Sequence, residues 1–430
     1  MFATSPIVGA LRHRPFGTLW AGQVFSQVGD GLQRVALAWW VLRHSSSGFH
    51  MALVLACSYV PSILFAAWGG TLADRLPRTR VMAACDLLRG LLLLLIGGLA
   101  LGGGLELWHL YILAALLGTA EAFFTPAYEA AVPWVTPAAL LAGANALRSV
   151  GYDTSDIVGM TIGGMAIAAW GPALIFLING VSYLVAAACA LAVGRMTGER
   201  RPQPTRAPGR WWEEASVGLR VVRDTPWLSA GIGACILLNT LQNAIMIIGL
   251  PLLAAGGREA QPSDLGLTMG AVAAGSLAMA LWLGRRQLPA RQLSLFCYGG
   301  AAVCGLAMLG VGANDSWWIV ALCAAIYGAS LTAGGLAWTR ALQLSIPDEI
   351  FGRVSAVDSA VSWICGPLGV LLAGALMTAD NAAMLIAAGG AASIVVALAA
   401  LWLPITRDMG CQTTDKLERA SAGLPAGEAT

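Results

Sequence analysis

A stripe of polar side chains follows one face of the first long apolar run, residues 16–42. Its members are spaced by four, three and four residues, which places them on one side of a helix: Gln23, Gln27, Asp30 and Arg34. Charged side chains inside a membrane span normally face a cavity or a partner, because an isolated charge is costly in lipid. We therefore expect the stripe to line a cavity. Asp30 and Arg34 are also one helical turn apart, so an ion pair within the helix is the alternative.

A single carboxyl group, that of Glu121, stands near the middle of the apolar run 108–132, with Thr125 on the same helical face. No basic residue lies within sequence reach to neutralise it. Desolvation favours the protonated form of such a group, which is the property that a proton carrier needs. Glu121 is therefore the first candidate for proton coupling and Asp30 is the second. The alternative is a protonated carboxyl group that serves as a structural hydrogen-bond donor.

The run of residues 138–168 carries Arg148, Tyr152 and Asp156 on one side of a helix. Because this run follows directly on the previous one, Arg148 is a candidate counter-charge for either of the two candidate carboxyl groups. Contact with a substrate and structural pairing within the N-terminal half both remain open for these three residues.

Amide and aromatic side chains are the candidates for lining a cavity in the second half of the chain. They recur at helical spacing: Asn239, Gln242 and Asn243 in the run 227–254, and Tyr327 and Trp338 in the run 317–344. The amide face carries no charged side chain, so we expect an uncharged wall. Such a wall opposite a charged N-terminal half suits a small amphiphilic molecule.

The composition defines the class of protein that positions these groups. Of the 430 residues, 57% are hydrophobic and only 11% are charged, and the mean hydropathy is +0.72. A membrane-spanning helix needs about 20 apolar residues. We expect an all-α integral membrane protein with about twelve spans, at residues 16–42, 50–73, 80–102, 108–132, 138–168, 173–194, 227–254, 265–284, 291–312, 317–344, 352–377 and 380–404.

Arginine residues are concentrated in alternate loops of this arrangement. Because cytoplasmic loops carry the excess of positive charge, we expect a multi-pass protein of the cell membrane with both termini in the cytoplasm. The longest polar stretch, residues 196–226, divides the chain into N-terminal and C-terminal halves, residues 1–195 and 227–404. Residues 405–430 are small and polar, which predicts a disordered cytoplasmic tail.

Several classes of function are excluded by what the sequence does not contain. It has no nucleotide-binding loop, and its single lysine, Lys416, lies in the tail. No combination of residues supports an enzyme, a metal site or a cofactor, and the cysteines occur singly. The formal net charge is only +2, so no nucleic-acid partner is implied. We expect a monomer in the lipid bilayer.

A charged hinge, Gly70–Arg80, separates the second and third apolar runs, and glycine motifs recur in both halves at Ile157–Gly164 and Ile364–Gly369. The hinge resembles the cytoplasmic loop motif of the major facilitator superfamily. The matching residues are Gly70, Asp74, Arg75, Arg78 and Arg80, whereas Pro77 replaces the usual glycine. The resemblance covers the whole chain.

One branch of that superfamily, which exports drugs and siderophores and includes macrolide efflux proteins and the enterobactin exporter, resembles this chain further. The matches are Phe16–Gln23 with Ser26, Gly29 and Asp30, then Thr125–Ala127, Ala144–Leu147 and Gly352–Val354. Met160 stands where efflux members commonly place a proline in the fifth-span glycine motif. This departure weakens the expectation of antiport without removing it.

The resemblance implies two pseudo-symmetric bundles of six helices and a secondary active exporter. Its substrate would be a small amphiphilic molecule such as a drug, a siderophore or a secondary metabolite. Protons would drive export in antiport, by alternating access. A lysophospholipid flippase of the same fold is one alternative, and a receptor or regulator that does not transport is another.

The hinge also suggests a cytoplasmic gate. Asp74 is expected near the positive N-terminal end of the eleventh helix, where a carboxylate is favoured by roughly 0.3–1 kcal/mol. Arg78 is expected to pair with Glu129 at the end of the fourth span. The alternative is that these charges only set the topology and the tight turn.

Overall fold

A computed structural model describes residues 6–45, 47–73, 75–198, 219–255, 261–286 and 288–404. The described residues are almost entirely helical, with one isolated bridge between Ser47 and Thr378. Ten helices in this part of the chain are long and apolar enough to cross a membrane. The prediction of an all-α, multi-pass membrane protein is therefore confirmed.

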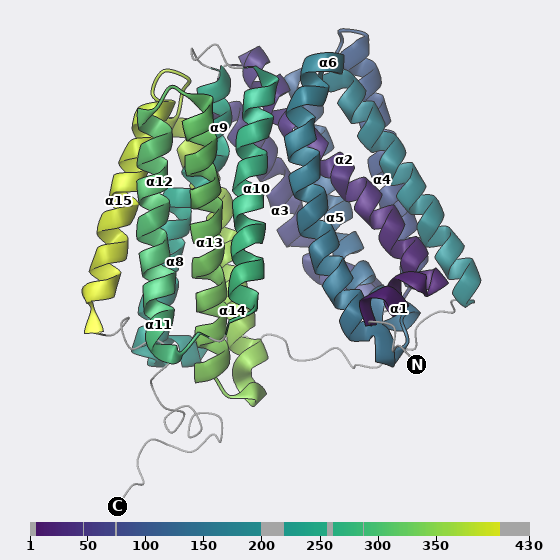
Figure 1. Ribbon diagram of the computed structural model, residues 1–430. Helices are drawn as coiled ribbons and strands as arrows, with labels where there is room; N and C mark the ends of the chain where they lie inside the picture. Colours follow the sequence, from purple (N-terminus) through teal and green to yellow (C-terminus); the bar gives the residue numbers. More distant parts are fainter. Residues whose placement is uncertain are drawn as a thin grey trace, which may run out of the picture. The chain divides into compact units, whose positions relative to one another are not determined.

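The N-terminal helices are α1 (Pro6–Arg12), α2 (Arg14–Ser45), α3 (Gly48–Ala73), α4 (Arg78–Leu101), α5 (Leu107–Val135), the short helix η1 (Ala138–Leu140) and α6 (Leu141–Thr197). The later helices are α8 (Pro226–Asn239), η2 (Thr240–Ala244), α9 (Ile245–Ala255), α10 (Pro262–Gly284), α11 (Ala290–Ser294), η3 (Leu295–Gly299), α12 (Gly300–Ala313), α13 (Trp317–Ser345), α14 (Asp348–Leu376) and α15 (Ala382–Trp402). They are shown in Figure 1.

The ten candidate spans differ from the twelve predicted for two reasons. First, α6 covers two of the predicted runs, which are separated by a non-helical residue, Gly171 (φ 74°, ψ 164°). Pro172 follows, and proline begins a helix readily because its missing N–H needs no partner there. Second, α2 is long enough to span but is not among the ten, since its polar stripe dilutes its hydropathy.

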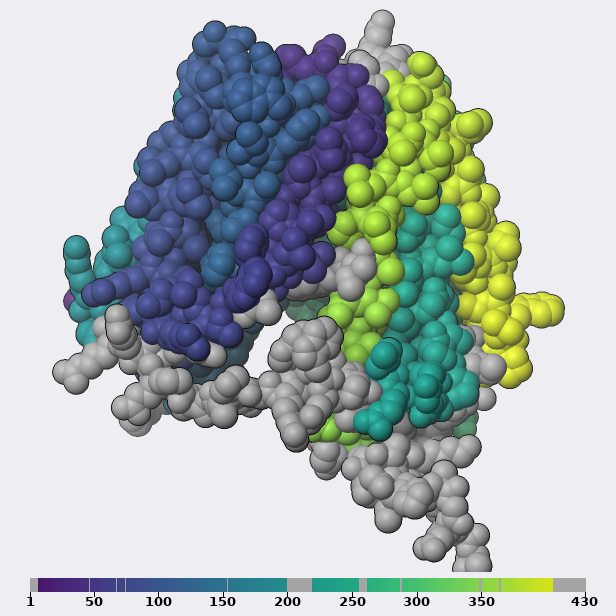
Figure 2. Space-filling model, turned by 180° about the vertical axis from the view of Figure 1, so that it is seen from behind, coloured from purple at the N-terminus to yellow at the C-terminus, as the bar shows by residue number. Residues whose placement is uncertain are grey.

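The helices form two compact units. The described residues of unit 1 are those up to 198, together with 250–255, 261–273 and 374–380. Unit 2 holds the remaining described residues, and in it α8 lies beside α15 (Figure 2). Most of the predicted linker and all of the predicted tail lie outside the described residues. The division at residues 196–226 stays a prediction.

In unit 1, α2 lies between the two arms of α6. Gly31 of α2 faces Gly159 in the first arm, and a Cβ on Gly31 would lie 2.8 Å from the Gly159 Cα. Gly29 faces Asn179 and Ser182 in the second arm, where a Cβ would overlap both side chains. Small residues permit such close helix packing in membranes. This packing brings the polar face of α2 against polar groups of α6.

Replacement of Gly159 by alanine is expected to destabilise unit 1, because the new methyl group would overlap the Val28 carbonyl oxygen and lie 2.8 Å from the Gly31 Cα of α2 in an unadjusted structure. Overpacking of this kind costs roughly 1–3 kcal/mol. The matched control is Gly98→Ala in α4, where nothing lies within 4 Å of the added Cβ. Thermal unfolding of the purified variants measures the effect. A Tm of Gly159→Ala equal to that of Gly98→Ala would contradict the close packing.

Candidate functional site

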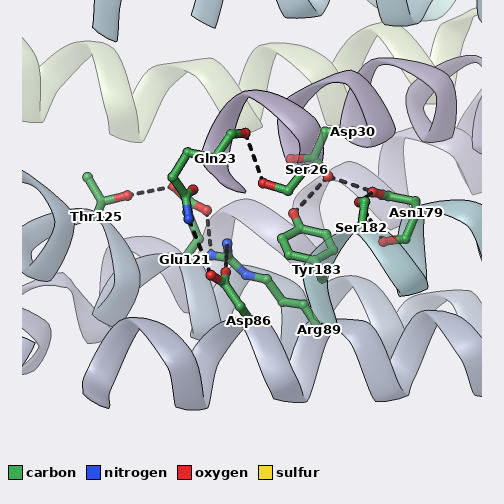
Figure 3. A network of polar contacts seen from close by, with 10 residues as sticks. All are labelled: Gln23, Ser26, Asp30, Asp86, Arg89, Glu121, Thr125, Asn179, Ser182 and Tyr183. Carbon is green, nitrogen blue, oxygen red and sulfur yellow. Dashed lines mark hydrogen bonds and ion pairs between the residues drawn. The ribbon is translucent and has the colours of Figure 1, made fainter. Parts of the chain in front are cut away.

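A network of polar side chains lies inside unit 1, where α2, α4, α5 and the second arm of α6 meet (Figure 3). Its members are Gln23, Ser26, Asp30, Asp86, Arg89, Glu121, Thr125, Asn179, Ser182 and Tyr183. On α4 the two charged members, Asp86 and Arg89, are three residues apart and lie on the face that also buries Met82 and Leu93. The hydrophobic face of α4 therefore carries an acid and a base into the packed interior.

Arg89 is the only guanidinium group in this network among the described residues, and it is 4% exposed. Its Nη2 lies 2.6 Å from Oε2 of Glu121, and its Nη1 lies 3.8 Å from Oδ1 of Asp86. The guanidinium carbon is 4.8 Å from the ring centroid of Phe124 and 5.5 Å from that of Tyr183. Aromatic faces attract a desolvated cation, so Arg89 is held from several sides.

Glu121 is not a lone carboxyl group, although no base lies within sequence reach of it. Glu121 pairs with Arg89 and also accepts a hydrogen bond from Thr125 Oγ1 at 2.6 Å. The base comes from another helix 32 residues away, which no local sequence window reveals. Arg148, the predicted counter-charge, pairs with neither Glu121 nor Asp30. The Glu121 side chain is 54% exposed, so this carboxylate lies at the surface of the network.

Asp86 was missed by the sequence analysis together with Arg89. The signal was present, since two opposite charges three residues apart are unusual within an apolar helix of 24 residues. Asp86 is 0% exposed. Its Oδ2 accepts a long hydrogen bond from Gln23 Nε2 at 3.4 Å, and its Oδ1 has no hydrogen-bond partner among the described residues. It is the least well solvated carboxyl group of the network.

Asp30 is held by hydrogen bonds rather than by an ion pair. Its Oδ1 accepts from the Tyr183 hydroxyl group at 2.7 Å and from Asn179 Nδ2 at 3.1 Å. Ser182 Oγ donates in turn to Asn179 Oδ1 at 2.9 Å, and Asn179 also contacts Gln33. These partners fix the orientation of the Asp30 carboxyl group on α2.

The alternative of an ion pair between Asp30 and Arg34 is wrong, because the Arg34 side chain turns to the first arm of α6. Its Nη1 lies 2.7 Å from Oδ1 of Asp156, and Tyr152 stands beside the same guanidinium group. The structure therefore brings together three of the predicted site residues in a second, more exposed cluster. Gln27 is partly buried on α2.

The amide residues of unit 2 do not share one face. Gln242 is buried and donates to the backbone carbonyl of Ala301 at 2.8 Å, whereas Asn239 and Asn243 are exposed. The physical reason is η2, a π-helical turn at Thr240–Ala244 that shifts the register of the helix. A prediction that assumes a regular helical period along the sequence does not include such a turn.

The expectation of an uncharged second half is also wrong. Trp338 is buried, and its Nε1 donates to both carboxylate oxygens of Asp358 in α14, at 3.3 and 3.2 Å. Tyr327 is 2% exposed within unit 2. The carboxyl group of Asp358 lies within a candidate span, and the sequence analysis overlooked it.

The charged hinge is shorter than its sequence motif. Helix α3 continues through Gly70 to Ala73, and α4 already begins at Arg78, with Pro77 as its N-terminal cap residue. The two exposed arginines of the motif are Arg75 and Arg80. Proline fits the position before a helix because its φ is fixed near −65°. Asp74 lies outside the described residues.

The predicted pair between Arg78 and Glu129 is not formed. Arg78 Nη1 donates instead to the backbone carbonyl of Ala130 at 3.0 Å, and the adjacent Glu129 side chain is exposed. This contact ties the start of α4 to the end of α5. At this point the loop motif is anchored to the backbone of α5.

Comparisons with known proteins agree with this architecture. The sequence model of the transmembrane secretion effector family matches residues 4–421. The multidrug efflux pump Tap of Mycolicibacterium fortuitum is 28% identical over 413 residues, which cover 92% of this chain and 95% of that protein. Macrolide efflux protein A of Streptococcus pyogenes is 24% identical over 369 residues, covering 83% and 88%.

A solved structure of a bacterial homologue of the human lysosomal transporter Spinster, in an inward-facing and unoccupied conformation, shares the fold. The TM-score is 0.66 at 14% sequence identity, and the match covers 93% of this chain and 98% of that chain. The family match extends over nearly the whole sequence, and these relatives are transporters rather than enzymes. The chain belongs to the transmembrane secretion effector family, a branch of the major facilitator superfamily of membrane transporters.

Proposed function

We propose that this protein exports a small amphiphilic molecule across the cell membrane in exchange for protons, by alternating access of one central site. Export of drug-like molecules is supported by the relatives, which are named as a multidrug efflux pump and a macrolide efflux protein. We further propose that it acts as a monomer with both termini in the cytoplasm, and that the hinge around Arg75 and Arg80, with Asp74, belongs to its cytoplasmic gate.

The observation that carries proton exchange is the imbalance of charge in the network of unit 1. Among the described residues it contains three carboxyl groups, those of Asp30, Asp86 and Glu121, but one guanidinium group. The nearest further cation, Arg34, is already paired with Asp156. Three ionised carboxylates around one cation would leave uncompensated negative charge in a desolvated interior, which costs several kcal/mol or more. Uptake of protons removes this cost.

A buried group that must gain a proton in one state and lose it in another can couple transport to a proton gradient. The same excess of acceptors attracts a cationic group of a substrate, which competes with the proton for the negative charge. We assign Glu121 and Asp30, the candidates from the sequence, to this coupling as members of the network that also contains Asp86. The cluster of Arg34, Tyr152 and Asp156 and the side chain of Arg148 are assigned to substrate contact.

Replacement of Glu121 by glutamine is expected to abolish efflux that depends on a pH gradient, because Arg89 loses its ionised partner at 2.6 Å. Arg89 is buried, and a buried charge that loses its closest partner is costly, so the effect on the site is large. The measurement is substrate efflux from vesicles with and without an imposed pH gradient. The matched control is Asp380→Asn, which makes the same change of carboxyl to amide at an exposed loop position.

Full efflux driven by the pH gradient in Glu121→Gln, at the level of the Asp380→Asn control, would contradict the role of Glu121 in coupling. Equal loss in both variants would instead indicate a general effect of the substitution on the protein. Thermal unfolding of both variants in the same lipid establishes that each is folded.

Arg34→Gln is expected to impair transport much more than stability. The Arg34 side chain is 48% exposed, and ion pairs with such exposure contribute only about 0–1 kcal/mol. The expected fall in Tm is therefore below about 4 °C, whereas the rate of efflux falls because a charged group of the candidate substrate cluster is lost. Thermal unfolding and efflux are compared on one preparation. A large loss of stability with an unchanged rate per folded molecule would reverse this assignment.

A further inference from the structure

We propose that Asp86 carries the exchanged proton and that Arg89 couples it to the substrate by moving between Asp86 and Glu121. The inference rests on the proposed function, and it deepens that function by naming the group that binds the proton and the class of substrate that displaces it. The substrate is an amphiphile with a cationic group.

The three carboxyl groups of the network differ sharply in how well they solvate a negative charge. Glu121 has a charge-assisted bond to Arg89 at 2.6 Å and accepts from Thr125. Asp30 accepts two hydrogen bonds, at 2.7 and 3.1 Å. Asp86 has only the long bond from Gln23, and its Oδ1 is buried without a hydrogen-bond partner among the described residues. A buried carboxylate with a single long hydrogen bond and a distant cation is the most costly of the three to ionise.

Every helix packed around Asp86 contributes a group that bears on its charge. Asp30 approaches from α2 and Glu121 from α5, and both oppose a further negative charge. Arg89 lies on the same helix, and Tyr183 of α6 faces Arg89. Among these charged groups only Arg89 favours the ionised form of Asp86, and the closer partner of Arg89 is Glu121. The resting arrangement is therefore a protonated Asp86 beside an ion pair of Arg89 and Glu121.

Gln23 suits both protonation states of Asp86. Its amide carries a donor and an acceptor, so it can donate to the carboxylate or, after a rotation, accept from the carboxylic acid. Gln23 is 4% exposed, and its Nε2 is the sole hydrogen-bond donor to Asp86 among the described residues. The polar stripe of α2 thus provides a partner for the proton-carrying group.

The geometry of Arg89 allows it to exchange partners with little movement. A guanidinium group presents donors on two sides in one plane, and Arg89 already directs Nη2 to Glu121 and Nη1 towards Asp86. The distance of 3.8 Å from Nη1 to Asp86 Oδ1 needs to shorten by about 1 Å to form a charge-assisted hydrogen bond. No change of helix position is needed for that shift.

This exchange links the proton to the substrate. When a cationic group binds the half-exposed carboxylate of Glu121, Arg89 moves to Asp86, and the O–H bond of the Asp86 carboxyl group breaks to release one proton. When the cation leaves, a proton returns to Asp86 and Arg89 returns to Glu121. One positive charge enters for each proton that leaves, so the net charge of the network stays constant.

The first test locates the proton without any substrate. Infrared spectroscopy of the full-length protein in lipid at neutral pH detects the C=O stretching band of a protonated carboxyl group. The band is expected in the wild type and in the control Asp380→Asn. It is expected to disappear in Asp86→Asn, and also in Glu121→Gln, where Arg89 has lost its closer partner and is free to pair with an ionised Asp86. Asp86→Glu keeps a carboxyl group at this position and is expected to show the band. A band that persists in Asp86→Asn and disappears in Asp30→Asn overturns the assignment.

The second test measures coupling. Vesicles containing the protein extrude ethidium, a fluorescent organic cation, with and without an imposed pH gradient, and the ratio of the two rates is compared. One ligand usually changes the affinity for a second, coupled ligand by roughly 5–150-fold. A ratio of about ten is therefore expected in the wild type, and in Asp86→Asn it is expected to fall about tenfold, to near one. Asp86→Glu and Asp380→Asn keep a ratio above one. Thermal unfolding establishes that Asp86→Asn is folded.

The outcomes separate this inference from the proposed function. A ratio above one in the wild type that Asp86→Asn retains contradicts the role of Asp86 alone. A ratio of one in the wild type contradicts proton exchange itself, whichever variant carries the infrared band. Arg89→Lys keeps the charge but loses the planar guanidinium group, and it is expected to lower the ratio. An unchanged ratio in Arg89→Lys removes the exchange of partners from the mechanism.

Discussion

The buried guanidinium group of Arg89 is the interaction on which the rest of unit 1 depends. It stands among three carboxyl groups contributed by three helices, and aromatic rings of α5 and α6 cover it. A cation in this position would be very costly without anionic partners, and the acids would be equally costly without the cation. The positive and negative charges of the network therefore balance only when all its members are present. A change at one member alters the protonation or pairing of the others.

The packing of α2 makes this balance depend on helix position. Gly29 and Gly31 let α2 approach both arms of α6, and that approach places Asp30 within hydrogen-bond distance of Tyr183 and Asn179. A small displacement of α2 relative to α6 would change the solvation of Asp30 and the position of Gln23 beside Asp86. Transport by alternating access requires helices to move, so the protonation of the network and the conformation of unit 1 are physically linked.

The sequence predicted the fold class and the membrane spans well, because the apolar runs are long and the polar stripe of α2 follows a regular helical period. It failed where partners come from other helices. The pairs of Arg89 with Glu121 and of Arg34 with Asp156 join residues 32 and 122 positions apart. It failed again at the π-helical turn beside Gln242, where the regular period is interrupted. The ion pairs between helices and the position of the π-helical turn are both determined only when the helices pack.

The central claim is that the network of unit 1 exchanges protons for substrate, and reversing the driving force tests it most directly. A gradient of ethidium is imposed across vesicles that contain the protein and a trapped pH indicator, with no initial pH gradient. The account predicts that protons move opposite to ethidium in the wild type, at a rate that rises with the ethidium gradient. Ethidium movement through the protein without any accompanying proton movement would contradict it.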